Sequence, residues 1–253
     1  MTRFREAFVT GASSGIGRAV SLELARRGAF VHVFARRAHD LDALVDEIRA
    51  EGGDAHALPG DVTDLASVTR AVDEADARTE SGLDLVLAGA GVAESSVRDA
   101  DPTRTAHTVF EVNLTGAAAT LEAGIRVMRP RGHGTVAVLS SLAAARGLPG
   151  AAAYCASKSA ISAYSESTRI DLRGTGIAVV DVRPGFVRTP MTAPNRFPMP
   201  FLMDADSAAR RALDGIERGC AVVRFPRRLA WPLELAARIL PGPAWRRLVG
   251  GKT

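Results

Sequence analysis

The sequence has few cysteines and no arrangement of residues that would build a metal site. Its 253 residues include two cysteines, Cys155 and Cys220, and no Cys-x-x-Cys pair. We therefore expect two small buried thiols in a reducing compartment rather than a disulfide scaffold. The five histidines are scattered without zinc-ligand spacing, which predicts that no metal is bound.

Long apolar runs and long basic runs are also absent. No stretch of about 18 apolar residues occurs, which predicts that no helix crosses a membrane. The chain runs from Met1 almost directly into an expected strand, which leaves no room for a signal peptide and favours a cytoplasmic location. The formal net charge is +4, but no cluster of lysine and arginine is long enough to suggest a nucleic-acid partner.

What the sequence does contain is an alternation of β-rich and helical segments, which we interpret as one globular domain over residues 1–253. Several β-rich runs are apolar almost throughout, as in strands buried on both faces of a parallel sheet. The alternation predicts an α/β fold, a doubly wound, Rossmann-like parallel sheet of about seven strands with helices on both faces. The expected strands are Glu6–Thr10, Phe30–Ala35, Asp54–Leu58, Leu83–Ala88, Gly134–Ser140, Ile177–Val182 and Ala221–Phe225. The expected helices are Gly15–Arg27, His39–Glu51, Asp64–Thr79, Thr103–Met128, Ala151–Arg173 and Asp204–Arg218.

Residues 227–253 depart from this alternation and are expected to form a short helical C-terminal extension of the same domain. Arginines and two tryptophans, Trp231 and Trp245, surround an apolar stripe with helical spacing. The stripe consists of Leu229, Leu233, Ala236, Ala237, Ile239 and Leu240. Three interpretations remain open: a helix packed on the domain, which is the commonest use of such a stripe, an oligomer contact, and a basic amphipathic helix on a membrane surface.

A glycine-rich turn, Thr10–Gly17, follows the first expected strand with the spacing Gly-x-x-x-Gly-x-Gly. Glycines at such a turn let the backbone approach a pyrophosphate, and the next helix offers N–H donors and the positive end of its dipole. This predicts a dinucleotide site. Its expected contacts are Gly11, Ser13, Ser14, Gly15, Ile16 and Gly17.

Two arginines, Arg36 and Arg37, follow the second expected strand, where a site selective for NAD would place an acidic residue. Guanidinium groups match a 2′-phosphate, so the pair predicts NADP(H) as the preferred cofactor, with NAD(H) as the second choice. The alternative is that both are solvated surface arginines in an arginine-rich chain.

Tyr154 and Lys158 stand four residues apart in an expected helix, so their side chains share one face. A phenol held beside an ammonium group has its anion stabilised, which predicts a lowered pKa for Tyr154. The tyrosine is thus a candidate general acid or base.

Together these motifs resemble those of the short-chain dehydrogenases/reductases over roughly residues 4–225. Ser141 stands 13 residues before Tyr154, at the family spacing of its catalytic serine, and Asn113 stands where the family keeps an active-site asparagine. Asp61 and Val62 resemble the adenine-contacting pair. Pro184, Gly185, Val187 and Thr189 resemble the nicotinamide-contacting segment.

One motif departs from the family pattern. After the fourth strand the family usually carries Asn-Ala-Gly, whereas this chain has Gly89, Ala90 and Gly91. The small residues that let the cofactor pass are retained, so all three remain expected cofactor contacts. The lost amide puts local stability and packing near the adenosine in doubt.

The resemblance implies an NADP(H)-dependent oxidoreductase that interconverts a carbonyl and a secondary alcohol. Tyr154 is then the general acid or base, Ser141 polarises the carbonyl, and Lys158 lowers the pKa of Tyr154 and holds the nicotinamide ribose. Asn113 supports a water relay to Lys158, or else is a helix-interior asparagine that bonds to backbone. Ser140 is the nearest rival of Ser141, but adjacent strand residues face opposite ways, so only one can face the site. A non-catalytic NADP(H)-binding sensor or scaffold is the alternative function.

The segment Thr189–Met203 follows the sixth expected strand and is rich in methionine, phenylalanine and proline. It predicts an apolar lid over an apolar small-molecule substrate, with a proline-rich loop packed on its own domain as the alternative. The helix around Thr103–Met128 and the helix with Tyr154 resemble those that the family uses in homodimers and homotetramers.

Overall fold

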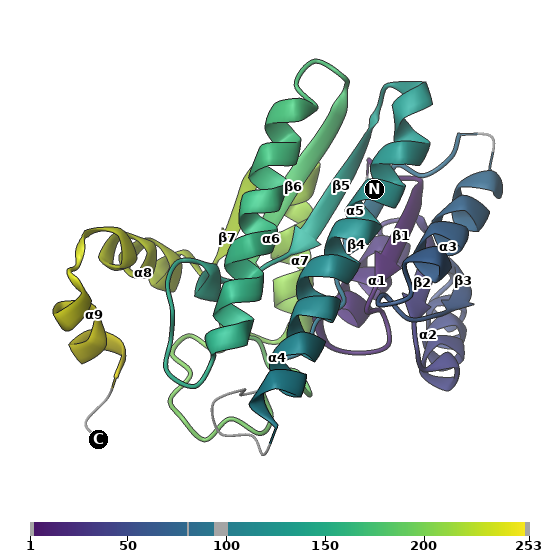
Figure 1. Cartoon of the computed structure of the whole chain (residues 1–253). Helices are drawn as coiled ribbons and strands as arrows, with labels where there is room; N and C mark the ends of the chain where they lie inside the picture. The colour runs from purple at the N-terminus through teal and green to yellow at the C-terminus, as the bar shows by residue number, and fades with distance from the viewer. Residues whose placement is uncertain (1–2, 80, 94–100, 251–253) are drawn as a thin grey trace.

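Seven parallel strands form one sheet in the computed structural model, which describes residues 3–79, 81–93 and 101–250. The spatial order is β3-β2-β1-β4-β5-β6-β7, and each neighbouring pair of these strands is parallel. This confirms the predicted doubly wound sheet (Figure 1). The strands are β1 (Glu6–Thr10), β2 (Phe30–Ala35), β3 (Asp54–Pro59), β4 (Leu85–Ala88), β5 (Gly134–Leu139), β6 (Ile177–Pro184) and β7 (Val222–Phe225).

Helices cover both faces of this sheet (Figure 1). Their bounds agree with the expected ones within a few residues, except between residues 102 and 128. The helices are α1 (Gly15–Arg26), α2 (Ala38–Ala50), α3 (Leu65–Ala77), α4 (Pro102–Phe110), α5 (Ala117–Met128), α6 (Ala152–Asp171), α7 (Ala205–Glu217), α8 (Arg227–Ile239) and α9 (Gly242–Val249).

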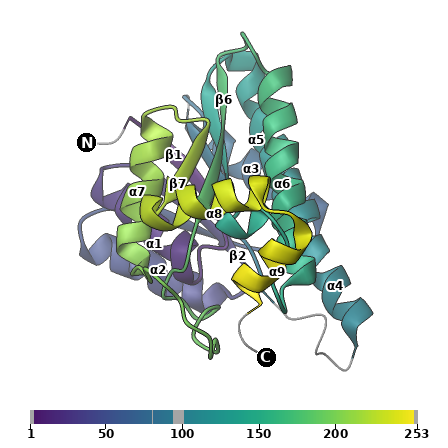
Figure 2. The same cartoon turned by 90° about the vertical axis from the view of Figure 1, so that its left-hand side faces the viewer.

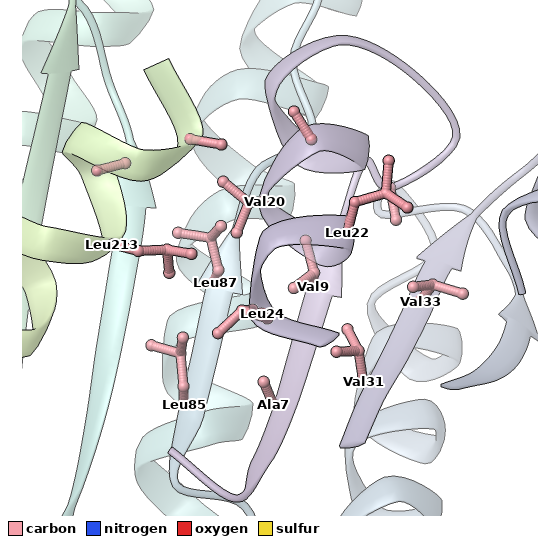
Figure 3. Close-up of a cluster of buried hydrophobic side chains, with 14 of the residues drawn as sticks. Ala7, Val9, Val20, Leu22, Leu24, Val31, Val33, Leu85, Leu87 and Leu213 are labelled. Atoms are coloured by element: carbon pink, nitrogen blue, oxygen red, sulfur yellow. The ribbon is translucent and has the colours of Figure 1, made fainter. Parts of the chain in front are cut away.

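Alternate side chains of each strand supply two apolar clusters, one on each face of the sheet. On β1, Val9 belongs to the cluster beneath α1, α2 and α7, whereas Phe8 belongs to the cluster beneath α3, α5 and α6. Figure 3 shows the first cluster, in which Val20 of α1 and Leu213 of α7 lie close to Leu87 of β4. Because the strand order reverses between β1 and β4, their carboxyl ends open into a crevice where ligands of such sheets bind.

The helix expected over Thr103–Met128 is present without a break, but its middle is wider than an α-helix, which the prediction did not include. A π-helical segment, Glu111–Gly116, separates α4 from α5. It carries Asn113, whose side-chain amide is tied to the backbone of Val92 in the chain after β4. Hydrophobic periodicity cannot reveal such a wider turn, because the apolar face continues across it.

The C-terminal extension consists of α8 and α9, which lie beside the β7 edge of the sheet (Figures 1 and 2). Trp245 is buried, whereas Ile239 is 66% exposed, so Ile239 does not share the half-buried environment of the rest of the expected apolar stripe. None of the described helices is both long enough and apolar enough to cross a bilayer.

A titratable pair is buried at the amino ends of β1 and β2. His32 is fully buried, its Nε2 lies 3.2 Å from Oε2 of Glu6, and its Nδ1 has no hydrogen-bond partner among the described residues. Burial and, to a lesser degree, repulsion by Asp84 raise the pKa of Glu6 to about 7, although Arg78 opposes the shift. Burial lowers the pKa of His32 to about 4. The folded chain therefore favours the neutral form of both groups.

The raised pKa of Glu6 predicts a pH-dependent loss of stability. The folded chain retains this proton to higher pH than the unfolded chain, so the stabilisation is complete below about pH 4.5 and is lost as the pH rises through about 7. We expect the unfolding free energy of the wild type to fall by up to about 3 kcal/mol relative to Glu6→Gln across this range. Urea unfolding of both proteins at about pH 5 and about pH 7.5 measures it. The lowered pKa of His32 acts in the opposite direction in both proteins, so a constant difference between them would contradict the prediction.

Candidate active site

The glycine-rich turn after β1 closes tightly against the turn after β4. Gly11 has a positive φ of 70°, and a Cβ at this position would lie 2.6 Å from the Cα of Ala90. A Cβ on Gly17 would collide with the carbonyl oxygen of Gly11. Ser14, the N-cap residue of α1, makes no side-chain capping bond, so the first-turn N–H groups remain available to an anion. The turn thus has the open, side-chain-free form that a phosphate group requires.

The turn after β4 explains how the chain manages without the usual asparagine. The hydroxyl of Thr10 accepts hydrogen bonds from the backbone N–H groups of Gly89, at 3.0 Å, and Ala90, at 3.3 Å. A Cβ on Gly89 would lie 2.6 Å from the carbonyl oxygen of Thr10. In this arrangement a side chain at position 89 has no room, and Thr10 holds the turn instead.

The two arginines after β2 lie at the rim of the same crevice. Arg37 donates a hydrogen bond to the Ser13 hydroxyl at 3.0 Å and pairs with Asp40. Arg36 is largely exposed and lies 3.8 Å from Asp61, which makes at most a weak surface pair. Both arginines line this crevice together with the glycine turn.

Ser141, Tyr154 and Lys158 converge at the carboxyl ends of β5 and β6. Ser141 follows β5, and its hydroxyl lies close enough to the phenol of Tyr154 to influence the pKa of that phenol. Lys158 is buried, and its Nζ donates to the carbonyl oxygen of Leu139 at 2.7 Å and lies 5.8 Å from the centre of the Tyr154 ring. Helix α6 carries Tyr154 and Lys158 on one face, as their spacing predicted.

The expected fall in the pKa of Tyr154 is not what the structure shows. Burial raises the pKa of this phenol, and the neighbouring hydroxyl of Ser141 only partly offsets the rise. Lys158 does not counter it, because its Nζ is directed to a backbone carbonyl and its own pKa is lowered by burial to about 8, against the pull of Asp181. Helical spacing puts two side chains on one face, but it does not determine the distance between their polar ends.

The two serines after β5 divide as the strand alternation predicted. The Ser140 hydroxyl turns into the protein, where it bonds to the carboxylate of Asp181 and lies 3.3 Å from the carbonyl oxygen of Val182. The Ser141 hydroxyl accepts a bond from the N–H of Ala143 at 3.1 Å and remains beside Tyr154. Both serines line the cavity, but the Ser140 hydroxyl is bonded to Asp181, which leaves Ser141 as the serine beside Tyr154.

Asn113 is fully buried and serves the backbone, although not the backbone of its own helix. Its amide accepts from the N–H of Val92 at 2.8 Å and donates to the carbonyl oxygen of Val92 at 2.9 Å and to the Ser157 hydroxyl at 3.1 Å. A Cβ on Gly91 would lie 3.4 Å from Oδ1 of Asn113 and 3.5 Å from Nζ of Lys158. Asn113 thus ties the loop after β4 to α6 beside Lys158.

One cavity of about 270 Å³ gathers the predicted residues. All of the expected cofactor contacts line it, together with Ser141, Tyr154 and Lys158, whereas Asn113 stands behind its wall. Sequence reasoning missed several positions that complete the cavity or support it. These are Thr10, Gly60, Val92, Val112, Leu139, Ser157 and Thr192. Only Thr10, at the end of a strand that leads into glycines, carried a signal that could have identified it.

The expected lid is a loop whose two ends are joined. Arg188 N–H donates to the carbonyl oxygen of Met203 at 2.7 Å, and Met203 N–H donates to that of Phe186 at 3.0 Å. Met191 lines the cavity and is 39% exposed, and Phe197 and Phe201 are half exposed. The segment is therefore partly free of its own domain on the side of the cavity mouth.

Comparison with known proteins decides the family. A family model described as short chain dehydrogenase matches residues 5–198. The chain belongs to the short-chain dehydrogenase family. An uncharacterised oxidoreductase of Myxococcus xanthus is 45% identical over 240 residues, which cover 95% of this chain and 94% of that protein. A 3-oxoacyl-acyl-carrier-protein reductase of Staphylococcus aureus is 33% identical over 193 residues, 76% of this chain and 78% of that one.

A solved structure supports the same assignment. The short-chain dehydrogenase of Sphingobium yanoikuyae in complex with NADPH superimposes with a TM-score of 0.80 at 26% identity, over 98% of this chain and 96% of that chain. As a member of the short-chain dehydrogenase family, the chain is an oxidoreductase that uses an NAD(P) cofactor.

The cavity fits such a cofactor by its own geometry. The turn at Gly11 and Gly17 has no room for a Cβ, and the uncapped start of α1 offers N–H donors, so a pyrophosphate fits there. Pro184, Gly185 and Thr189 line the opposite part of the same cavity, next to Tyr154 and Lys158. The adenosine would then lie toward Arg36 and Asp61, and the nicotinamide toward Tyr154.

Proposed function

We propose that the chain is an NADP(H)-dependent reductase or dehydrogenase that interconverts a carbonyl and a secondary alcohol on an apolar small molecule. The observation that carries the proposal is that Ser141 and Tyr154 line the same cavity side by side, together with Lys158 and the glycine turn. Two hydroxyl groups that face the same space can both contact one substrate oxygen. A protein that only binds the cofactor has no need of that arrangement.

Tyr154 is the proton donor in the reducing direction, and Ser141 donates a second hydrogen bond to the same oxygen. Donors held in place before the reaction stabilise the negative charge that the carbonyl oxygen develops. The nicotinamide, when bound, supplies or accepts the hydride. The Nζ of Lys158 points to Leu139, so it would have to turn toward the phenol oxygen to stabilise the phenolate that remains after proton transfer.

Lys158 has a second role on the cofactor side of the cavity. Its Nζ spends one donor on Leu139 and keeps others for the hydroxyl groups of the nicotinamide ribose. Asn113 positions Lys158 indirectly. It bonds to Ser157, the neighbour of Lys158 on α6, and to Val92 in the loop after β4, so it holds that helix against that loop. These contacts support a positioning role for Asn113 rather than direct contact with substrate.

The two arginines after β2 predict a preference for NADPH over NADH. Replacement of Arg36 and Arg37 by alanine removes two cations that match the 2′-phosphate, which NADH lacks. We expect the KM for NADPH to rise at least about tenfold more than the KM for NADH, consistent with charge-assisted hydrogen bonds of roughly 1.5–3 kcal/mol. Steady-state kinetics with both cofactors measure this. Arg49→Ala, an exposed arginine on α2, is the control, and equal changes for both cofactors would show that the arginines only decorate the surface.

Two further features bear on the class of substrate and on the number of subunits: the apolar lid, and exposed apolar residues on α4 and α6. Met191 at the cavity mouth favours an apolar ketone, aldehyde or secondary alcohol. Phe110 on α4 and Ile170 on α6 are exposed apolar residues on the helices that resemble the family's subunit contacts, so we include a homodimer or homotetramer in the proposal.

The experiment that tests the function is a fluorescence titration with NADPH and NADH, followed by a panel of carbonyl compounds with NADPH oxidation as the readout. Tight binding of NADPH with turnover of apolar ketones is the expected result. Tight binding without turnover of any carbonyl compound would favour the alternative, a sensor or scaffold that binds NADP(H). Absence of binding would contradict both and would point to the missing asparagine at Gly89.

A further inference from the structure

We infer that the outer surface of α8 and α9 docks on an anionic lipid membrane. The surface is defined by the exposed residues of these helices and is called the α8–α9 surface below. It combines an apolar stripe with arginines and lacks any exposed acidic residue among residues 226–250. The apolar members are Trp231, Leu235, Ile239 and Leu248, and the basic members are Arg227, Arg228, Arg238, Arg246 and Arg247.

The apolar stripe is continuous along α8. Trp231, Leu235 and Ile239 follow one another at intervals of four residues, so they share one helix face. Their exposed fractions are 62%, 59% and 66%. Leu248 on α9 is equally exposed, at 59%. Three large apolar side chains on one face of α8, with a fourth on α9, form a surface that favours burial against a partner.

The inner face of α8 and α9, by contrast, is fixed to the domain. Arg146 in the loop after Ser141 donates to the carbonyl oxygens of Ala237, at 3.2 Å, and Leu240, at 2.7 Å. Trp245 is buried and donates through Nε1 to the carbonyl oxygen of Gly147 at 2.9 Å. The extension is therefore held in one orientation, and its exposed face is the side left over after this packing.

The exposed charge on this extension has one sign only. Its single acidic residue, Glu234, is buried and pairs with Arg224 at 2.8 Å and Arg183 at 3.5 Å. The five exposed arginines make no ion pair with any residue that the structure describes. Arginines beside an apolar helix face, with a tryptophan among them, are suited to the headgroup region of an anionic bilayer.

The same charges disfavour a second copy of the chain as the occupant. A two-fold interface would place this patch against itself and bring arginines of one copy onto those of the other. An anionic lipid surface offers opposite charge together with an apolar layer. In both views α9 and the loop after β6 lie toward the end of the molecule where the strands' carboxyl ends open, so docking would bring the cavity near the membrane (Figures 1 and 2).

Sedimentation of the full chain with vesicles tests the proposal. We expect binding to vesicles of phosphatidylcholine with phosphatidylglycerol, and at least about tenfold weaker binding to phosphatidylcholine alone. The triple variant Arg227→Gln, Arg228→Gln, Arg238→Gln should bind anionic vesicles at least about tenfold more weakly than the wild type, since each arginine near the surface contributes to attraction. The control Arg49→Gln, Arg173→Gln, Arg218→Gln removes equal charge from exposed positions elsewhere and should stay within about twofold of the wild type.

An apolar pair of variants tests the stripe separately. Leu235→Gln should weaken binding at least about threefold, whereas Leu65→Gln, which removes an exposed leucine on α3, should not. The number of subunits, measured by sedimentation equilibrium, should be the same for all proteins, and NADPH binding should show that each is folded. If the α8 triple variant and the control triple variant lost equal binding to anionic vesicles, the attraction would depend on net charge alone, and the proposal would be overturned. The proposal would also be overturned if the wild type did not bind vesicles and the α8 variants had a different number of subunits. That result would assign the α8–α9 surface to contact with a second copy of the chain.

Discussion

Tyr154→Phe should lower kcat/KM for carbonyl reduction by at least about 100-fold while NADPH binding stays within about threefold of the wild type. The substitution removes one oxygen atom and leaves the ring that Lys158 contacts at 5.8 Å from its centre. General acid catalysis by a positioned side chain contributes about 10²–10⁴-fold, which sets the expected size.

The chain provides a matched control for this variant in its second tyrosine. Tyr164 lies on the same helix, donates to Glu122 at 2.6 Å, and has a pKa raised to about 12, so it stands outside the cavity chemistry. Tyr164→Phe should leave kcat/KM within about twofold of the wild type. Full activity of Tyr154→Phe would exclude Tyr154 as the proton donor.

Gly11→Ala should weaken NADPH binding at least about 100-fold and destabilise the protein by roughly 1–3 kcal/mol. A Cβ there would lie 2.6 Å from the Cα and 2.7 Å from the N of Ala90, so two backbone segments would have to separate. Those segments form the floor on which a pyrophosphate would rest. Fluorescence titration with NADPH and thermal unfolding measure the two effects.

Gly28→Ala is the control that separates two effects of Gly11→Ala: the collision of the new Cβ with Ala90, and the strain of a positive φ in alanine. Gly28 also has a positive φ, at 93°, but a Cβ there would meet no atom within 4 Å. It should lose stability, because a left-handed conformation strains alanine, and yet bind NADPH as the wild type does. If Gly11→Ala bound NADPH normally, the glycine turn would not be the pyrophosphate site.

Much of the fold follows from local pattern. The apolar runs at β4 and β5 and the alternation with helices were enough to predict a doubly wound parallel sheet, because strands buried on both faces are apolar almost throughout. The π-helical segment at Glu111–Gly116 could not be predicted, since the apolar face continues across it.

In the candidate site, too, local sequence rules predicted some features and failed on others. Spacing and strand alternation singled out Ser141 over Ser140, and they placed Tyr154 and Lys158 on one helix face, because both rules are local and geometric. They failed on the pKa of Tyr154, which burial raises. Desolvation depends on the walls that β5, β6 and the lid build around the phenol, and no motif encodes how closely they approach.

The residue types and their order along the chain determined the sheet, the glycine turn and the pair of hydroxyl groups that can meet one substrate oxygen. The tertiary structure decided what long-range contacts control: that Thr10 holds the turn which lacks an asparagine, that Lys158 points to Leu139, and that Ile239 faces outward. Periodicity assigns a side chain to a face of its own helix or strand. Only packing against distant segments determines whether that face is buried, what it bonds to, and how much water remains.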